Sequence, residues 1–228
     1  MANELKQFNF DKLSFGKAVA GNPMGKSRYI KPPISKTIPE RRLKYKFAEE
    51  LARDIKPELG MRAFVFLDGT FVAGDFIEAW FVEHHIIAKE LTISTLSLNP
   101  NNVDSLANLM ECGYIESLNL IVSDYFYSHE RQTLVPYIRE KLDKDNRFQF
   151  AAAGTHCKLT LFETHKGAKV VIHGSANLRS SSNIEHMTIE ENPELFDFIM
   201  EMQRTILEKY KTINKAVRYN SIWQADHK

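Results

Sequence analysis

Residues 155–190, THCKLTLFETHKGAKVVIHGSANLRSSSNIEHMTIE, determine how the rest of the chain is interpreted. Two apolar runs with strand character, 159–162 and 168–172, are separated by a polar turn that contains Gly167. Side chains that can carry chemistry stand just outside both ends of this pair. The stretch therefore predicts two adjacent strands with a functional site at their ends.

Five polar residues flank these two strands. His156 and Lys158 precede the first strand, Ser175 and Asn177 follow the second, and Glu185 comes after a short polar loop. Residues two apart on an extended chain project from the same face. An imidazole backed by a hydroxyl or a carboxylate can act as a base or a nucleophile. A lysine ammonium and an asparagine amide can hold an oxyanion, phosphate above all.

Each short pattern also occurs in ordinary structural turns, whereas the joint spacing is restrictive. H-x-K-x4-E spans 156–163, G-S-x-N spans 174–177, and N-x-E spans 183–185. This arrangement resembles the motif of the phospholipase D superfamily, H-x-K-x4-D followed by G-S/G-x-N. It is most similar to the small single-motif endonucleases of that superfamily, which share the downstream N-x-E. The chain departs from the family at Glu163, where the family has Asp.

The resemblance implies a role for each of the five residues. His156 would attack phosphorus and form a covalent phosphohistidine, while Lys158 and Asn177 hold the non-bridging oxygens. Ser175 would lie beside the phosphate or the imidazole, and Glu185 would hydrogen-bond the histidine and fix its tautomer. The family pairs two such motifs, and this chain has one, so we expect a homodimer with a composite site. We expect no metal ion and no cofactor.

The charge of the chain is unevenly distributed. Residues 1–46 contain eleven Lys or Arg and three acidic residues, a net charge of +8, whereas the remainder has a net charge of −7. A basic arm with interleaved aromatic residues is suited to nucleic acid, DNA in preference to RNA. It is also suited to a tail that docks on the acidic body of its own or a neighbouring chain. The candidate substrate-binding cations are Lys26, Arg28, Lys36, Arg41, Arg42 and Lys44.

These features predict a metal-independent phosphodiester hydrolase that acts on nucleic acid as an endonuclease. Two alternatives stay open at this stage: a phospholipid phosphodiesterase or transferase, and a non-catalytic nucleic-acid-binding module on the same fold. Neither an apolar run of about 18 residues nor an apolar leader is present, so no membrane partner is expected. With two cysteines that lack metal-site spacing, the composition favours a cytoplasmic protein.

The periodicity predicts an α/β protein, a phospholipase D-like sandwich in which helices flank a mixed β-sheet. Residues 1–60 are interpreted as a basic N-terminal arm plus one helix, and residues 61–228 as the catalytic domain. Within the arm, 1–39 are expected to be irregular and 40–56 to form an amphipathic helix. Strands are expected at 62–67, 91–98, 117–126 and 147–153, and helices after Asp75, after Asn99, near 134–136 and from Pro193. The pair His84 and His85 is interpreted as structural, because adjacent helical residues point about 100° apart.

Overall fold

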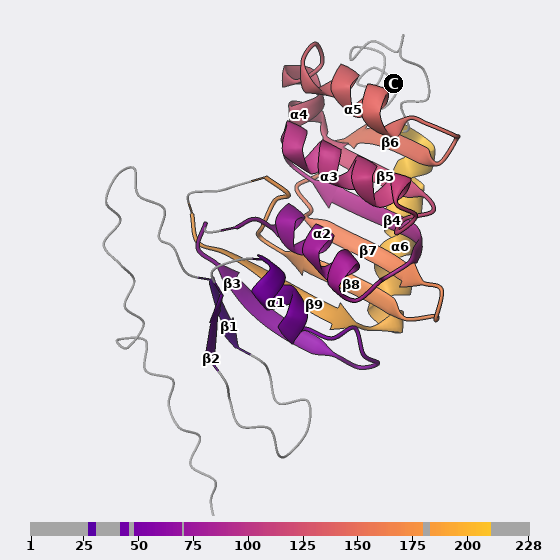
Figure 1. Cartoon of the computed structure of the whole chain (residues 1–228). Coiled ribbons are helices and arrows are strands. Elements are labelled where there is room, and N and C mark those ends of the chain that lie inside the picture. The colour runs from indigo at the N-terminus through magenta and orange to yellow at the C-terminus, as the bar shows by residue number, and fades with distance from the viewer. Residues whose placement is uncertain (1–26, 31–41, 46–47, 70, 180–182, 211–228) are drawn as a thin grey trace, which may run out of the picture.

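A single mixed sheet of nine strands organises the chain (Figure 1). The structure is a computed structural model, and it describes residues 27–30, 42–45, 48–69, 71–179 and 183–210. The strands are β1 (Ser27–Ile30), β2 (Arg42–Tyr45), β3 (Arg62–Leu67), β4 (Ala88–Thr95), β5 (Leu118–Ser123), β6 (Phe148–Ala153), β7 (Leu159–Thr164), β8 (Lys169–Gly174) and β9 (Glu185–Glu191). The helices are α1 (Ala48–Asp54), α2 (Ala73–Glu83), α3 (Pro100–Glu111), α4 (Asp124–His129), α5 (Leu134–Leu142) and α6 (Pro193–Tyr210).

The strand order is β2-β1-β3-β9-β8-β7-β4-β5-β6. The pairs β4–β5 and β5–β6 are parallel, and every other pair within this described sheet is antiparallel. Helices α1 to α5 cover one face of the sheet and α6 crosses the other (Figure 1). The predicted α/β sandwich with a mixed sheet is therefore confirmed.

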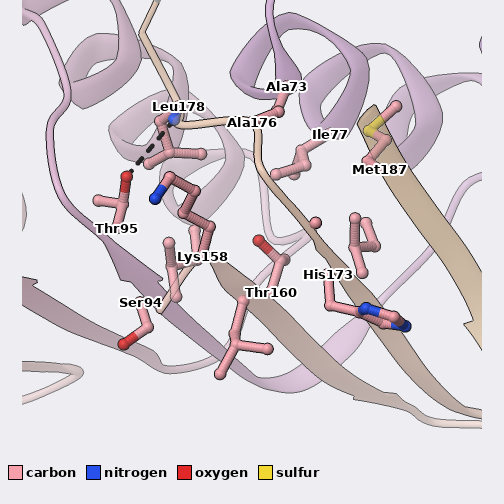
Figure 2. A pocket seen from close by; sticks show the side chains of 14 residues that line it. Ala73, Ile77, Ser94, Thr95, Lys158, Thr160, His173, Ala176, Leu178 and Met187 are labelled. Atoms are coloured by element: carbon pink, nitrogen blue, oxygen red, sulfur yellow. Dashed lines mark hydrogen bonds between the residues drawn. The ribbon is translucent and has the colours of Figure 1, made fainter. Parts of the chain in front are cut away.

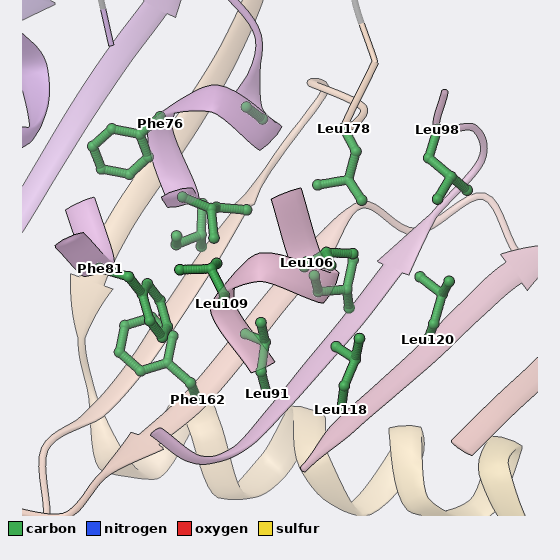
Figure 3. Packing of buried hydrophobic residues seen from close by; sticks show 14 of the residues in the cluster. Phe76, Phe81, Leu91, Leu98, Leu106, Leu109, Leu118, Leu120, Phe162 and Leu178 are labelled. Carbon is green, nitrogen blue, oxygen red and sulfur yellow. The ribbon is translucent and has the colours of Figure 1, made fainter. Parts of the chain in front are cut away.

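The main core lies between the sheet and helices α1 to α5 (Figure 3). Trp80 of α2 is fully buried, stacks near Phe76 and donates its indole N–H to the Ile55 carbonyl at 2.6 Å. Leu51 of α1 lies in the same core. The predicted boundary between residues 60 and 61 thus falls between two elements, α1 and β3, that share one hydrophobic core. None of the described helices is both long and apolar enough to cross a bilayer.

The expected helix over 40–56 is wrong in its first half. Arg42–Tyr45 form β2, and the helix begins only at Ala48. The sequence LKYKF at 43–47 alternates apolar and basic residues, which is the period of a strand. β2 pairs with β1, so the expectation that 1–39 are irregular is wrong over 27–30.

The expected helix after Asp75 begins earlier and ends earlier than the sequence indicated. Val72 is the N-cap, and the Asp75 carboxylate accepts the Val72 N–H at 3.1 Å from the third helical position. At the other end His85 has a φ of 47°, and Ile86 N–H donates to the Phe81 carbonyl at 2.9 Å. This is a Schellman motif in which histidine occupies the position usually taken by glycine.

His84, the residue at the C-cap of α2, places a ring nitrogen 2.7 Å from the Ala52 carbonyl oxygen. The two histidines therefore have the structural roles expected of them. Asn99 caps α3 through the Asn102 N–H, α5 begins at Leu134, and α6 begins at Pro193, all as predicted. The short helix α4 and the strand β9 were not predicted from the sequence.

Candidate active site

The predicted site residues gather at one edge of the sheet. β7, β8 and β9 are successive antiparallel neighbours, so the start of β7, the end of β8 and the start of β9 lie together. Leu159 pairs with His173, and Gly174 pairs with Met187. We call this the motif edge. It carries His156 and Lys158 before β7, Ser175 and Asn177 after β8, and Glu185 at the start of β9.

Gly174 allows β8 and β9 to approach closely at the motif edge. A Cβ atom at this position would lie 2.2 Å from the carbonyl oxygen of His186 and 2.8 Å from the Cα of Met187. Directly after Gly174, the Ser175 N–H donates to the His186 carbonyl at 3.0 Å. The glycine of the G-S-x-N pattern is thus required by backbone packing, because every larger residue would push the two strands apart.

Ser175 links the two strands through its side chain as well. Its hydroxyl donates to the Glu185 carboxylate and accepts the His186 N–H at 3.0 Å. No hydrogen bond joins Glu185 to His156 among the described residues of the isolated chain. The role of Glu185 in orienting His156 therefore stays a prediction, whereas its bond to Ser175 is observed.

The nucleophile candidate and the nearest cation are in contact. The Lys158 ammonium lies 3.4 Å from His156 Nδ1 and donates to the His156 carbonyl oxygen at 3.2 Å. His156 is exposed and Lys158 is half-buried. A substrate can therefore reach the imidazole from solvent with a positive charge beside it.

The amide of Asn177 has a defined orientation. Its carbonyl oxygen accepts the Leu96 N–H at 3.2 Å and lies 3.5 Å from the Thr95 hydroxyl. The Thr95 hydroxyl, which is buried, also accepts the Leu178 N–H at 3.4 Å and donates to the Ser97 carbonyl at 3.0 Å. Because the amide oxygen is held by the end of β4, the amide NH2 is left to donate elsewhere.

Lys158, Thr95 and Leu178 line one small cavity of about 20 Å³ under the motif edge (Figure 2). A cavity of this volume holds about one water molecule, whereas His156 itself is open to solvent. Sequence reasoning missed Thr95 and Leu96, which lie about 80 residues from Asn177 in the chain and carry no motif of their own.

The remaining polar residues considered from sequence have other partners. Glu163 lies towards the opposite end of β7, where its carboxylate accepts from Lys89 at 2.8 Å. His173 bonds Glu190 at 3.1 Å, and His165 bonds Glu116 at 2.7 Å. Across the described ranges, no three His, Cys, Asp or Glu side chains are grouped so that they could hold a metal ion. Cys112 and Cys157 are both free and exposed.

The candidate substrate-binding cations are only partly described. Lys26, Lys36 and Arg41 lie outside the described residues. Arg28 of β1 is in register with Lys44 of β2 and with Phe66 of β3, and Arg42 is in register with Ile30. The backbone of the basic segment is thus joined to the sheet beside β3, the strand whose Leu67 pairs with Glu185.

No protein-family profile matches the chain, and neither does any curated protein sequence. Solved structures do match. A phosphatidylserine synthase from Haemophilus influenzae is 14% identical with a TM-score of 0.50, and the match covers 82% of this chain and 45% of that one. NucT from Helicobacter pylori is 15% identical with a TM-score of 0.44, over 53% of this chain and 80% of that one. Nuc, a phospholipase D family member from Salmonella typhimurium, is 14% identical with a TM-score of 0.41, over 53% and 78%.

The chain therefore has the phospholipase D-like fold that its motif predicted. The match to the synthase spans less than half of that enzyme, and identity is low in every comparison above. Substrate and reaction must consequently be argued from the residues of this chain.

Proposed function

We propose that the protein is a metal-independent phosphodiesterase that cleaves nucleic acid through a phosphohistidine formed on His156. The convergence of His156, Lys158, Ser175, Asn177 and Glu185 at the motif edge supports this proposal. One exposed imidazole lies beside an ammonium, and an amide with unused N–H donors follows the neighbouring strand. These groups are the ones that phosphoryl transfer without a metal ion requires.

The reaction has two steps. A ring nitrogen of His156 attacks phosphorus and forms a P–N bond, while the bond from phosphorus to the leaving oxygen breaks. Lys158 and the NH2 of Asn177 stabilise the charge on the non-bridging oxygens. A water molecule then attacks phosphorus, the P–N bond breaks, and the imidazole is regenerated.

The leaving oxygen needs a proton, and the water later gives one up. We assign both transfers to His156 of a second copy, which donates its proton in the first step and takes one back from water in the second. The active form would then be a dimer whose two motif edges meet on a two-fold axis. Light scattering should give twice the 26.3 kDa of one chain for the active species. Full activity in a species of one chain would refute the composite site.

The nucleic-acid substrate is inferred from charge and position. Residues 1–46 have a net charge of +8, and β1 within this segment pairs with β3 next to β9, where Glu185 lies. Electrostatic binding of a polyanion by such a segment weakens steeply as salt increases, because bound counterions are released from the nucleic acid.

A nuclease assay in excess EDTA tests the proposal most directly. Wild type should cleave a labelled oligonucleotide, and His156→Ala should reduce the rate at least 1,000-fold, in line with loss of a covalent nucleophile (~10³ or more). His165→Ala is the matched control, because His165 is an exposed histidine in the turn after β7, bonded to Glu116 at 2.7 Å. That variant should retain wild-type activity.

Three results would refute the proposal. They are cleavage that stops in EDTA, cleavage that persists in His156→Ala, and release of headgroup from phospholipid vesicles with no cleavage of nucleic acid. Acid-quenched reactions with 32P-labelled substrate should also trap label on wild type and on His165→Ala, but not on His156→Ala.

A further inference from the structure

Two exposed phenylalanines occupy the outward positions of β3. Phe64 and Phe66 are 36% and 38% exposed, whereas Ala63, Val65 and Leu67 between and beside them are buried. Outward positions of a sheet strand that faces water are ordinarily polar. The two rings lie 5.2 Å apart, edge to face, and the His186 ring of β9 stacks on Phe64 at 5.5 Å with an interplanar angle of 18°. We call Phe64, Phe66 and His186 the aromatic patch.

The patch lies on the face of the sheet that α6 crosses, but beyond the reach of that helix. Phe196 and Met200 of α6 pack on Leu161 and Val171, and Leu207 packs on β5 and β6. Among the described elements, α6 therefore packs on β5, β6, β7 and β8 and leaves the rings of β3 exposed. The aromatic patch is therefore part of the exposed surface and does not belong to the hydrophobic core.

The patch is continuous with the motif edge. His186 directly follows Glu185, and its backbone N–H donates to the Ser175 hydroxyl at 3.0 Å. Phe66 is in register with His186, one position from the pair of Leu67 and Glu185. Phe64 lies two residues farther along the strand, which is about 7 Å. β3 lies three strands from β7, about 14 Å at ordinary strand spacing, so a nucleic-acid strand bound at His156 that passes the ends of β8 and β9 and turns onto the face crossed by α6 can meet the patch within a few nucleotides.

β1, the neighbour of β3 on the side away from β9, belongs to the basic segment 1–46. Arg28 of β1 is in register with Phe66, and Lys44 of β2 is in register with Arg28. Aromatic rings beside a basic track are the combination by which proteins bind unpaired nucleic acid, since bases stack on the rings and the cations follow the phosphates. A duplex already stacks its bases internally and offers no such contact.

A second copy of the chain is the main alternative occupant. The two phenyl rings together expose only about 150 Å², from aromatic side chains of roughly 200 Å² each. A stable protein interface buries about 800 Å² per partner. The size of the patch and the net charge of +8 on residues 1–46 therefore fit two or three bases better than a protein surface.

We propose that the aromatic patch stacks bases of an unpaired nucleic-acid strand next to the cleaved phosphate, which makes single-stranded nucleic acid the preferred substrate. This inference rests on the proposed function for the site that it adjoins.

Binding is measured by fluorescence anisotropy with full-length His156→Ala, which leaves the substrate intact. The three probes are a 12-nucleotide single strand, the duplex of the same sequence, and an abasic strand of equal length that keeps the phosphates. We expect the base-containing single strand to bind about 10-fold or more tightly than the abasic one, because stacking is worth roughly 10- to 100-fold per base. Introducing Phe66→Ala or Phe64→Ala into the His156→Ala protein should remove most of this difference in affinity between the base-containing and the abasic strand.

Two further substitutions serve as controls. Phe66→Tyr keeps a ring and should keep the preference. Phe198→Ala removes a phenyl ring that is 75% exposed on α6 and should change none of the three affinities. Thermal melting of each variant confirms that the fold persists.

The results of these binding experiments distinguish the proposed base stacking by the aromatic patch from the proposed cleavage reaction. Equal binding of abasic and base-containing strands, or equal loss of duplex binding in Phe66→Ala, would overturn the inference. A change from dimer to monomer in Phe66→Ala would overturn it too and assign the patch to a second copy. If wild type cleaves no phosphodiester but the ring-dependent preference is present, the patch stands and the hydrolase assignment fails.

Discussion

Gly174→Ala should damage both the fold and the site, because it inserts one methyl group between β8 and β9. The added Cβ would lie 2.2 Å from the His186 carbonyl oxygen and 2.8 Å from the Met187 Cα, and both atoms belong to backbone. Ordinary contact begins at about 3.4 Å, so the strands must separate by roughly 1 Å. Neither neighbour is a flexible side chain that could turn away.

The energetic effect follows from what this separation breaks. The bonds from Ser175 N–H to the His186 carbonyl and from His186 N–H to the Ser175 hydroxyl, both 3.0 Å long, would stretch beyond hydrogen-bonding distance. Each contributes about 1 kcal/mol to stability. Overpacking adds about 1–3 kcal/mol. The free energy of unfolding should therefore fall by about 3–5 kcal/mol, which lowers the melting temperature by about 10 °C in a domain of this size.

Thermal and urea unfolding followed by circular dichroism measure this loss. Gly154→Ala is the matched control, because it lies just before the same motif and a Cβ there would meet only the Asp124 carboxylate, at 3.9 Å. That variant should stay within about 0.5 kcal/mol of wild type. A Gly174→Ala protein that melts within 2 °C of wild type would refute the reasoning. Loss of activity without loss of stability would show that the glycine serves the substrate instead.

Two further predictions concern the surroundings of the site. Thr95→Val should lower kcat about 10-fold, because the Asn177 amide then keeps the Leu96 N–H but loses the Thr95 hydroxyl, which also accepts the Leu178 N–H beside it. Thr95→Ser should restore the rate, and Thr160→Val, which removes a buried hydroxyl from β7, should leave it unchanged. Burial raises the pKa of Asp75, so the stability that this carboxyl contributes is present in acid and is lost as pH rises above the ordinary carboxyl range. Urea unfolding of wild type and Asp75→Asn from about pH 3 to about pH 7 should show wild type losing stability relative to the variant; parallel curves would contradict this.

Local signals in the sequence predicted the elements that local chemistry determines. Asn99 accepts the Asn102 N–H and starts α3, and Gly113, with a φ of 79°, follows the end of that helix. Hairpin β7–β8 was visible because a turn with Gly167 separates two apolar runs. At each of these points, one or two residues determine the backbone conformation.

Elements that depend on distant partners were missed. β9 lies between β3 and β8, so its residues 187–191 are all buried, Glu190 and Glu191 included. Residues 187–190, MTIE, do alternate apolar and polar residues, but a run of four is too short to mark a strand beside the polar loop that precedes it. Glu191 belongs to this buried run, and its carboxylate accepts the Gly60 N–H at 2.8 Å, from 131 positions away. The residues of β2 alternate with the period of a strand. The four-residue spacing of apolar residues over the longer stretch 40–56 predicted a helix there instead.

The candidate site likewise combines residues that the local sequence indicates with residues that only the fold brings near. The motif itself placed five residues at one edge, since strands joined by a short turn must bring their ends together. The groups that orient Asn177 come from elsewhere in the chain. Thr95 ends β4 and Leu96 directly follows it, and β4 pairs with β7 on the side away from β8. A pattern that covers 36 residues has no means of indicating them.

The proposed composite site has to account for the other histidines near the motif edge. Two other histidines lie beside the motif edge, His173 at the end of β8 and His186 at the start of β9. His173 bonds Glu190, and His186 stacks on Phe64 on the face of the sheet that α6 crosses. Both rings thus have partners within the chain, and in-line displacement requires the general acid on the side of phosphorus opposite His156. We therefore keep the proposal that the general acid is His156 of a second copy related by a two-fold axis.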